Sequence, residues 1–142
     1  MRILIDTNII LDSVLSRKPF CEDSDKVLKM CGEATSAIGC ISAHTITDMF
    51  YILRKDYNRR GQEELFDQLS KFLYIVPVNY LNLYKALHNT SFTDIEDCLQ
   101  AECAREFGAD YIVTRNVKDF TGSSIPAITP GEFIQLAEGT QQ

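Results

Sequence analysis

The sequence lacks an excess of basic residues: its 142 residues include 14 Lys and Arg against 20 Asp and Glu, for a formal net charge of −6. A nucleic-acid-binding protein that relies on its overall electrostatic field is basic. The composition excludes that class, so a polyanionic partner must be held locally, by a small basic patch or by bound cations.

Long apolar runs are also missing, and none approaches the ~20 residues of a membrane-spanning helix. Met1 leads directly into a strand-like segment, without the pattern of a signal peptide. The five cysteines form no C-x-x-C pair, which favours reduced thiols over a disulfide framework. A cysteine-based zinc site is not expected, because neither His44 nor His88 has the spacing of a zinc ligand. We therefore expect a cytoplasmic protein with no membrane partner.

Internal repeats, low-complexity tracts and interdomain linkers are absent from the sequence as well. Apolar residues make up 45% of the chain, enough to fill one core. The length suits one domain. We expect residues 1–142 to form a single domain, with the final GTQQ frayed.

The sequence does contain a regular alternation of short apolar segments and amphipathic segments. Strands are predicted at 2–5, 37–42, 74–78 and 110–114, with a weak last strand at the end of the loop 115–128. Helices are predicted at 9–15, 22–34, 43–57, 63–73, 80–90, 91–108 and 129–139. Thr93 is the expected cap of the helix over 91–108, with Glu96 at the capping-box position and Gly108 as its stop. This alternation predicts an α/β fold, a three-layer α/β/α sandwich with a central, mostly parallel sheet of about four or five strands.

Acidic and amide side chains follow the predicted strands. Asp6 follows the first strand, and Asn116 and Asp119 follow the strand over 110–114. Ligands of open α/β sheets bind at the carboxyl ends of the strands, so side chains from separate segments can converge there. Clustered carboxylates repel one another, and a hard cation such as Mg²⁺ or Mn²⁺ relieves the repulsion while leaving positions for water and phosphate. The pattern predicts a metal site with Asp6 as a ligand.

Two predicted helices add carboxylates to this set. Asp94 and Asp97 are one helical turn apart and share a face, and Asp48 follows Ser42 in another helix. A metal held by such acids can activate a water and neutralise the charge that builds on a phosphodiester. Structural roles are the alternative: Asp6 as a helix cap, Asp94 as an early-turn acid favoured by the helix dipole, and Asn116 as a turn residue.

Four motifs resemble the PIN-domain nuclease family, over roughly residues 2–136: ILIDTNIILD, ISAHTITD, DCLQAECA and IVTRNVKDF. The family's metal-binding acids correspond to Asp6 and Asp97. Asp48 stands where members usually carry Glu, and Asn116 stands where many carry Asp, so Asp119 is expected to supply that charge. The resemblance implies that Asp6, Asp48, Asp97 and Asp119 are catalytic, and that the metal ligands are Asp6, Asp97, Asn116 and Asp119.

The same resemblance implies an activity and partners. It implies a PIN-like fold and a Mg²⁺- or Mn²⁺-dependent endoribonuclease that leaves 5′-phosphate and 3′-hydroxyl ends on RNA. Stand-alone bacterial members of this size, the VapC-like proteins, are commonly toxins of toxin–antitoxin pairs and often dimerise. An antitoxin protein and a second copy of the chain are therefore expected partners.

Other polar residues are candidates for supporting roles or for contact with substrate. The supporting candidates are Asn8, Ser42, Thr114 and Asp94, although Ser42 can equally cap the helix that follows it. His44 is a possible general base, but a lone His on a helix is more often a packing or surface residue. The basic cluster of Arg54, Lys55, Arg59 and Arg60 is a candidate for RNA contact, against the alternative of a solvated helix end.

Two other functions fit parts of the pattern. A receiver-type phosphoacceptor also binds Mg²⁺ beside its first strand, but it needs paired acids there and an acceptor Asp at the end of a middle strand. Neither is present, since Thr7 and Asn8 follow Asp6 and the two middle strands end without Asp. A catalytically weakened PIN-like module that binds RNA or a protein is the other alternative, and it rests on Asp48 and Asn116.

Overall fold

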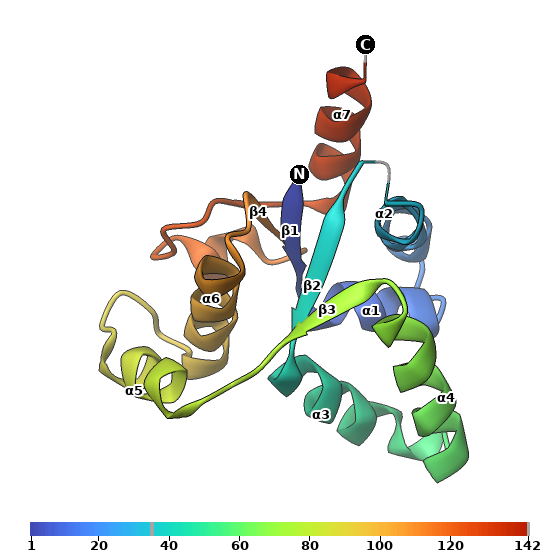
Figure 1. The fold of residues 1–142 in the computed structure, drawn as a ribbon, viewed down its shortest axis with the longest axis horizontal. Helices are drawn as coiled ribbons and strands as arrows, with labels where there is room; N and C mark the ends of the chain where they lie inside the picture. The colour runs from blue at the N-terminus through green and yellow to red at the C-terminus, as the bar shows by residue number, and fades with distance from the viewer. Residues whose placement is uncertain (35, 142) are drawn as a thin grey trace.

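In the computed structural model, which describes residues 1–34 and 36–141, five parallel strands form one sheet with helices on both faces (Figure 1). The strands are β1 (Arg2–Ile5), β2 (Ile38–Ser42), β3 (Leu73–Val76), β4 (Tyr111–Val113) and β5 (Ala127–Ile128). Their order across the sheet is β3-β2-β1-β4-β5, with every neighbouring pair parallel. The predicted α/β/α fold is confirmed.

Helices connect the strands at the places where the sequence predicts them. They are α1 (Thr7–Val14), α2 (Cys21–Gly32), α3 (Ala43–Ile52), α4 (Arg59–Ser70), α5 (Tyr80–His88), α6 (Ile95–Phe107) and α7 (Pro130–Thr140), with 3₁₀ turns at Leu53–Lys55 and Val117–Phe120. The helix expected to reach Tyr57 ends at Ile52 and passes into the first 3₁₀ turn. Helix α7 continues through Gly139 and Thr140, which we expected to be frayed, and Gln142 lies outside the described residues. Among the described helices, none is long and apolar enough to cross a membrane.

Helix α6 begins differently from the prediction. Its N-cap is Asp94, not Thr93, and the Asp94 carboxylate accepts hydrogen bonds from the backbone N–H groups of Glu96 and Asp97. A carboxylate caps as well as a hydroxyl and also suits the positive end of the helix dipole. The predicted stop is confirmed, since Gly108 has the left-handed φ of 73° that favours glycine at this position.

Alternate side chains of β1 pack against different helices. Ile3 and Ile5 share a buried cluster with residues of α1, α2, α3 and α7, whereas Leu4 packs against α6. In Figure 1, α5 and α6 lie on one side of the sheet and α1, α2 and α4 on the other. Both faces of the sheet are therefore covered, as the continuous apolar run of this first strand requires.

The sheet changes its direction of growth at β1. The chain adds β2 and then β3 on one side of β1, and it crosses to the other side to add β4 and β5. The backbone N–H of Asp6 donates to Val113 O at 3.0 Å, which places the end of β1 beside the end of β4. Such a switch point leaves a crevice at the carboxyl ends of the strands, and Asp6 stands in it.

Candidate functional site

A small acidic pocket lies at this switch point. Its volume is about 170 Å³, and its lining consists of Asp6, Thr7, Asn8, His44, Asp48, Glu96, Asp97, Gln100 and Asn116. A larger hollow of about 500 Å³ between α2 and β3 contains no acidic side chain. The structure thus brings five predicted residues into one pocket: Asp6, Asn8, Asp48, Asp97 and Asn116.

Asp6 is held rigidly in this pocket. Its Oδ1 accepts hydrogen bonds from the Thr7 backbone N–H at 2.9 Å and from Gln100 Nε2 at 3.2 Å. Its Oδ2 accepts from Thr114 Oγ1 at 2.8 Å. Asp6 is therefore both the cap of α1 and a wall of the pocket, so the structural and functional interpretations of this residue are compatible.

Gln100 lines the pocket, but it was not among the residues predicted from the sequence. It is only 3% exposed, and besides Asp6 its Nε2 contacts Thr45 Oγ1 at 3.1 Å. Its Oε1 is buried and has no hydrogen-bond partner. An unpaired buried amide oxygen is costly, and it suits a cation or a water at the pocket. The available signal was its place one helical turn after Asp97, on the face of α6 that turns inward.

Asp97 is a carboxyl group of the pocket whose pKa is raised. Burial, together with the charges of Asp94, Asp119, Asp6 and Glu96, raises the pKa of Asp97 from 3.8 to about 6. Asp94 and Asp119 are exposed and do not line the pocket, but their charges act on Asp97. A site that raises the pKa of a carboxyl group in this way gains stability from a bound cation, because the cation favours the ionised form.

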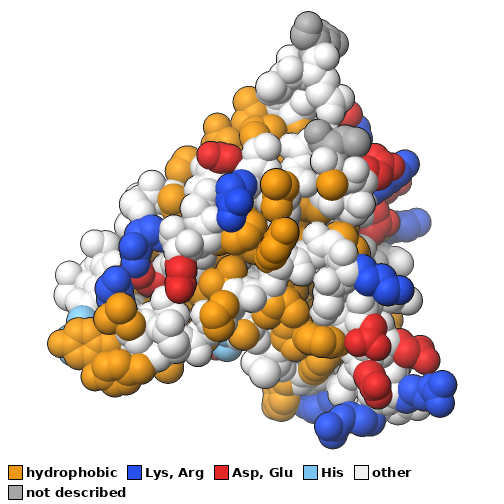
Figure 2. All heavy atoms as spheres, viewed as in Figure 1, with side chains coloured by type: hydrophobic (Ala, Val, Ile, Leu, Met, Phe, Trp, Pro, Cys, Tyr) orange, Lys and Arg blue, Asp and Glu red, His pale blue; other side chains and the backbone are white. Residues whose placement is uncertain are grey.

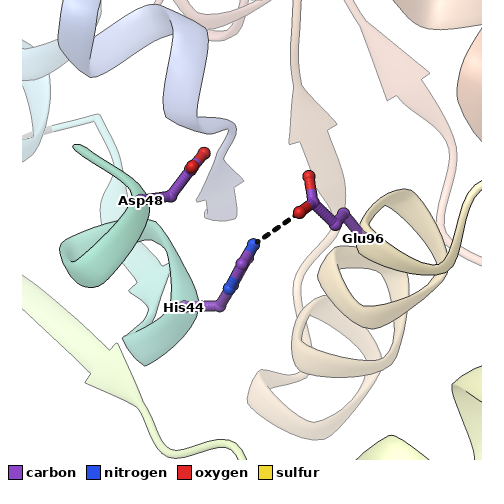
Figure 3. Close-up of side chains that lie close together, drawn as sticks. All are labelled: His44, Asp48 and Glu96. Atoms are coloured by element: carbon purple, nitrogen blue, oxygen red, sulfur yellow. Dashed lines mark ion pairs between the residues drawn. The ribbon is translucent and has the colours of Figure 1, made fainter. Parts of the chain in front are cut away.

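His44, Asp48 and Glu96, which also line the pocket, lie close together (Figure 3). Among the described residues, they form a group whose ligand atoms all lie within 4.8 Å of one another. His44 Nε2 is 3.6 Å from Glu96 Oε1, and this nitrogen is buried without a hydrogen-bond partner. From the sequence, His44 was expected to be a packing or surface residue rather than a general base, and Glu96 was expected only at the capping-box position of its helix.

Two of the supporting candidates position other residues. Thr114 Oγ1 accepts a hydrogen bond from the Asn116 backbone N–H at 3.0 Å while it donates to Asp6. Ser42 caps α3, since its Oγ accepts from the Thr45 backbone N–H at 3.1 Å. Thr114 links the ends of β1 and β4, and Ser42 sets the direction of the helix that carries Asp48.

A buried ion pair next to the pocket was also missed. Asp12 is fully buried, and its carboxylate accepts two hydrogen bonds from Arg115, at 2.6 and 3.2 Å. Arg17 approaches the same carboxylate at 3.6 Å. The pair ties α1 to the loop after β4, so it holds the segment that carries Asn116.

The basic cluster of Arg54, Lys55, Arg59 and Arg60 lies away from the pocket lining, at the end of α3 and the start of α4. Arg60 pairs with Glu64, and the Arg54 guanidinium stacks 4.0 Å from the ring centre of the exposed Tyr51. Figure 2 shows Lys and Arg side chains beside Asp and Glu side chains at the corner where α4 lies in Figure 1. The cluster is thus a patch of mixed charge with an aromatic ring at its edge.

The cysteines take no part in the pocket. All five are free, and burial raises the pKa of Cys31 and of Cys103 to about 12. Thiols with such pKa values stay protonated at neutral pH and bind metal poorly. The oxygen-rich pocket, with the unpaired Gln100 oxygen, fits a divalent cation of the Mg²⁺ or Mn²⁺ type instead.

The sequence matches a family model described as PIN domain over residues 2–118. Among curated proteins, none matches it significantly.

The structure is similar to solved structures at low sequence identity, including the following three. A toxin–antitoxin complex from Klebsiella pneumoniae gives a TM-score of 0.65 at 22% identity, covering 90% of this chain and 97% of that chain. VapBC2 from Rickettsia felis, bound to a DNA fragment from its promoter, gives a TM-score of 0.63 at 16% identity, covering 91% of this chain and 98% of that chain. FitAcB from Neisseria gonorrhoeae gives 0.62 at 16% identity, also covering 91% and 98%. At these identities the similarity shows the fold.

Proposed function

Since this chain belongs to the PIN-domain family, we propose that it is a Mg²⁺- or Mn²⁺-dependent endoribonuclease and the toxin of a toxin–antitoxin pair. The observation that carries the proposal is the convergence of Asp6, Asp48 and Asp97, from three separate segments, on one pocket at the switch point of the sheet. The receiver-type alternative is set aside, because its required acids are missing and the family is a different one.

The proposed ligands of the cation are Asp6, Asp97 and Asn116, which line the pocket, and Asp119, which lies outside the lining but whose charge acts on Asp97. When bound, a divalent cation lowers the pKa of a water and neutralises charge that builds on the phosphodiester. Asp6 offers a carboxylate whose direction is fixed by Thr114 and Gln100, so little reorganisation is needed on binding. Asp97 offers a carboxylate that burial and the surrounding acids make costly to ionise without a cation.

Asp48 and the supporting residues act on the substrate side of the pocket in this proposal. Asp48 lies on α3, across the pocket from α6, where its carboxylate can orient an attacking water and accept its proton. Asn8 lines the same pocket. Asp94 stays at the rim as the cap of α6, and its charge disfavours an approaching phosphate unless a cation is present.

RNA is the proposed substrate, and we place its backbone along the basic cluster of Arg54, Lys55, Arg59 and Arg60. The exposed ring of Tyr51 beside Arg54 supports this placement, because stacked aromatic and guanidinium planes bind unpaired bases. From His44 to Ile52, α3 rises about 12 Å, and Arg54 follows in the next 3₁₀ turn, so an RNA strand could reach both the cluster and the pocket.

We also propose a basic antitoxin segment and a second copy of this chain as partners. The net charge of −6 favours a basic protein partner. Five large apolar residues of α5 are exposed: Tyr80, Leu81, Leu83, Tyr84 and Leu87. Figure 2 shows hydrophobic side chains gathered at the corner where α5 lies in Figure 1. Several large apolar side chains exposed together on one helix are typical of a protein interface, and we assign this patch to the homodimer. The proposal includes a single domain over residues 1–142 and a cytoplasmic location, supported by the free thiols.

The test is RNA cleavage by the purified protein. Mixed cellular RNA is incubated with the protein and Mg²⁺, Mn²⁺ or a chelator, and the new ends are mapped. The proposal predicts cuts with either cation, none with chelator, and 5′-phosphate and 3′-hydroxyl ends. No cuts from folded protein would favour the weakened binding module, which the departures at Asp48 and Asn116 support.

A further inference from the structure

We propose that His44, Asp48 and Glu96 form a second cation site, next to the Asp6–Asp97 carboxylates, that prefers a transition-metal ion such as Zn²⁺ to Mg²⁺. The site shares the pocket with the proposed nuclease centre, but its ligand set includes a nitrogen. Zn²⁺ binding by these three residues is measured without RNA, so its outcome is separate from that of the proposed RNA cleavage.

Two elements bring the three ligands together. His44 and Asp48 are four residues apart on α3, so they project from one face of that helix. Glu96 comes from the first turn of α6. Figure 3 shows the imidazole of His44 and the carboxylate of Glu96 pointing toward each other across the gap between the two helices, with the Asp48 carboxylate beside them.

The distances suit a shared ion. With bonds of about 2.1 Å to nitrogen and oxygen ligands, two ligand atoms of a tetrahedral ion are about 3.4 Å apart. The 3.6 Å between His44 Nε2 and Glu96 Oε1 is close to this separation. The ligand atoms of all three residues lie within 4.8 Å of one another, so an inward side-chain movement completes the coordination.

Two buried polar atoms without partners point independently to a ligand. His44 Nε2 is buried and makes no hydrogen bond, and its distance to Glu96 exceeds that of a good one. Gln100 lines the same pocket and is only 3% exposed. Its Oε1 also has no hydrogen-bond partner. Because an unpaired buried polar group is costly, two of them at one pocket indicate a bound species there.

The nitrogen ligand sets the ion preference. Imidazole binds Zn²⁺ and other transition metals, whereas Mg²⁺ takes oxygen ligands and keeps most of its waters. The competing explanation is a simple ion pair between an imidazolium and Glu96, in which Nε2 carries a proton and binds no metal.

Ring-nitrogen NMR tests the inference directly, because the chain has only two histidines. His88 lies on α5, where its Nδ1 forms a hydrogen bond with Tyr84 O. It serves as the internal control. We expect Zn²⁺ alone, added to the full chain at neutral pH without RNA, to shift the Nε2 resonance of His44 and to leave that of His88 in place. An excess of Mg²⁺ should leave both resonances unchanged. Thiols do not interfere, since the signal reports the imidazoles only.

Variants give the second readout. His44→Gln should weaken Zn²⁺ binding in calorimetry by about tenfold or more, since even loss of a group that only supports a ligand costs that much. Glu96→Gln should weaken it similarly, and His88→Gln should not change it. The inference is overturned if saturating Zn²⁺ leaves the His44 nitrogens unmoved, or if His44→Gln binds Zn²⁺ as tightly as the wild type. Either result would favour the ion pair, and RNA cleavage by Asp6 and Asp97 would remain open.

Discussion

The raised pKa of Asp97 means that its ionised carboxylate lowers the stability of the folded protein, although the proposed cation site needs that charge. Its pKa in the folded protein is about 6, against 3.8 for an ordinary Asp. The folded state therefore loses stability as pH rises from about 4 to about 6, and above 6 the full loss persists. At pH 7 without a cation, the ionised carboxylate destabilises the fold.

We predict that Asp97→Asn raises the melting temperature at pH 7 in chelator by about 2 to 4 °C, which corresponds to about 1 kcal/mol after solvent screening. The gain should vanish near pH 4, where the wild-type carboxyl is protonated. Thermal unfolding of both proteins at the two pH values measures it. A lower melting temperature for the variant at pH 7 would contradict the assigned repulsion.

The buried Asp12 gives a second prediction at the residue scale. Arg115→Met should lower the free energy of unfolding by about 3 kcal/mol, because it leaves a buried carboxylate with only the more distant Arg17. Arg105→Met is the control, since the exposed Arg105 pairs with Glu102 at the surface and such pairs contribute about 1 kcal/mol or less. Urea unfolding compares the two variants, and equal losses would show that the buried pair has no special weight.

Single residues also mark what the sequence could and could not reveal. Asp6 and Asp97 were predictable, because one follows a clear strand and the other lies in a recognisable motif. Gln100 was missed, because its spacing after Asp97 indicates only a shared helix face, and its contacts depend on α6 packing against β1 and β2. His44 was named as a candidate from the sequence. Its neighbour Glu96 could not be, because it lies on a helix far along the chain.

At the scale of elements, β2 depends on a glycine that packs against its neighbours. A Cβ added to Gly39 would lie 2.7 Å from Cys31 Sγ and 2.8 Å from Leu73 Cδ2. These atoms belong to α2 and β3, so the contact lets the helix and the adjacent strand approach β2 closely.

We therefore predict that Gly39→Ala lowers the free energy of unfolding by about 1 to 3 kcal/mol through overpacking. Gly139→Ala is the matched control, because a Cβ there meets nothing within 4 Å and alanine favours the helix. Urea unfolding of the two variants decides the point. A Gly39→Ala protein as stable as wild type would show that α2 and β3 can move apart without cost.

Element positions were predictable because strand-like runs and helical spacing are local signals. The cap of α6 was not, because Thr93 and Asp94 both fit the cap pattern and only the hydrogen bonds distinguish them. The start of α4 at Arg59 was placed four residues too late, since its cap, Asn58, precedes a stretch with few apolar residues.

At the scale of the whole molecule, parallel order across the sheet turns distant motifs into one pocket. The rule that ligands bind at a switch point predicted this edge, and the strand order places β1 beside β4 there. The sequence predicted some of the acids that line the pocket, but not all of them. The structure lines it with Glu96 and leaves Asp119 and Asp94 outside the lining.

The apolar face of α5 leads to a prediction about assembly. Tyr80 is 79% exposed and Leu87 is 66% exposed, so burying them in a dimer would remove much apolar surface from water. We predict a dimer by sedimentation, and a folded monomer for Leu87→Glu. Leu136→Glu, at an exposed site on α7, should leave the dimer intact. A monomeric wild type would contradict the proposed interface.

Cleavage by Asp6→Asn tests most directly whether the acidic pocket is a nuclease centre. The variant keeps an oxygen for the Thr7 N–H and Gln100, and its amide can donate to Thr114 Oγ1, so the fold should survive. Glu33→Gln, an exposed change after α2, is the control. With matched melting temperatures and the same RNA and cation, we predict that wild type and Glu33→Gln cut and that Asp6→Asn does not. Cleavage by Asp6→Asn at the wild-type rate would contradict the assignment of this pocket as the nuclease centre.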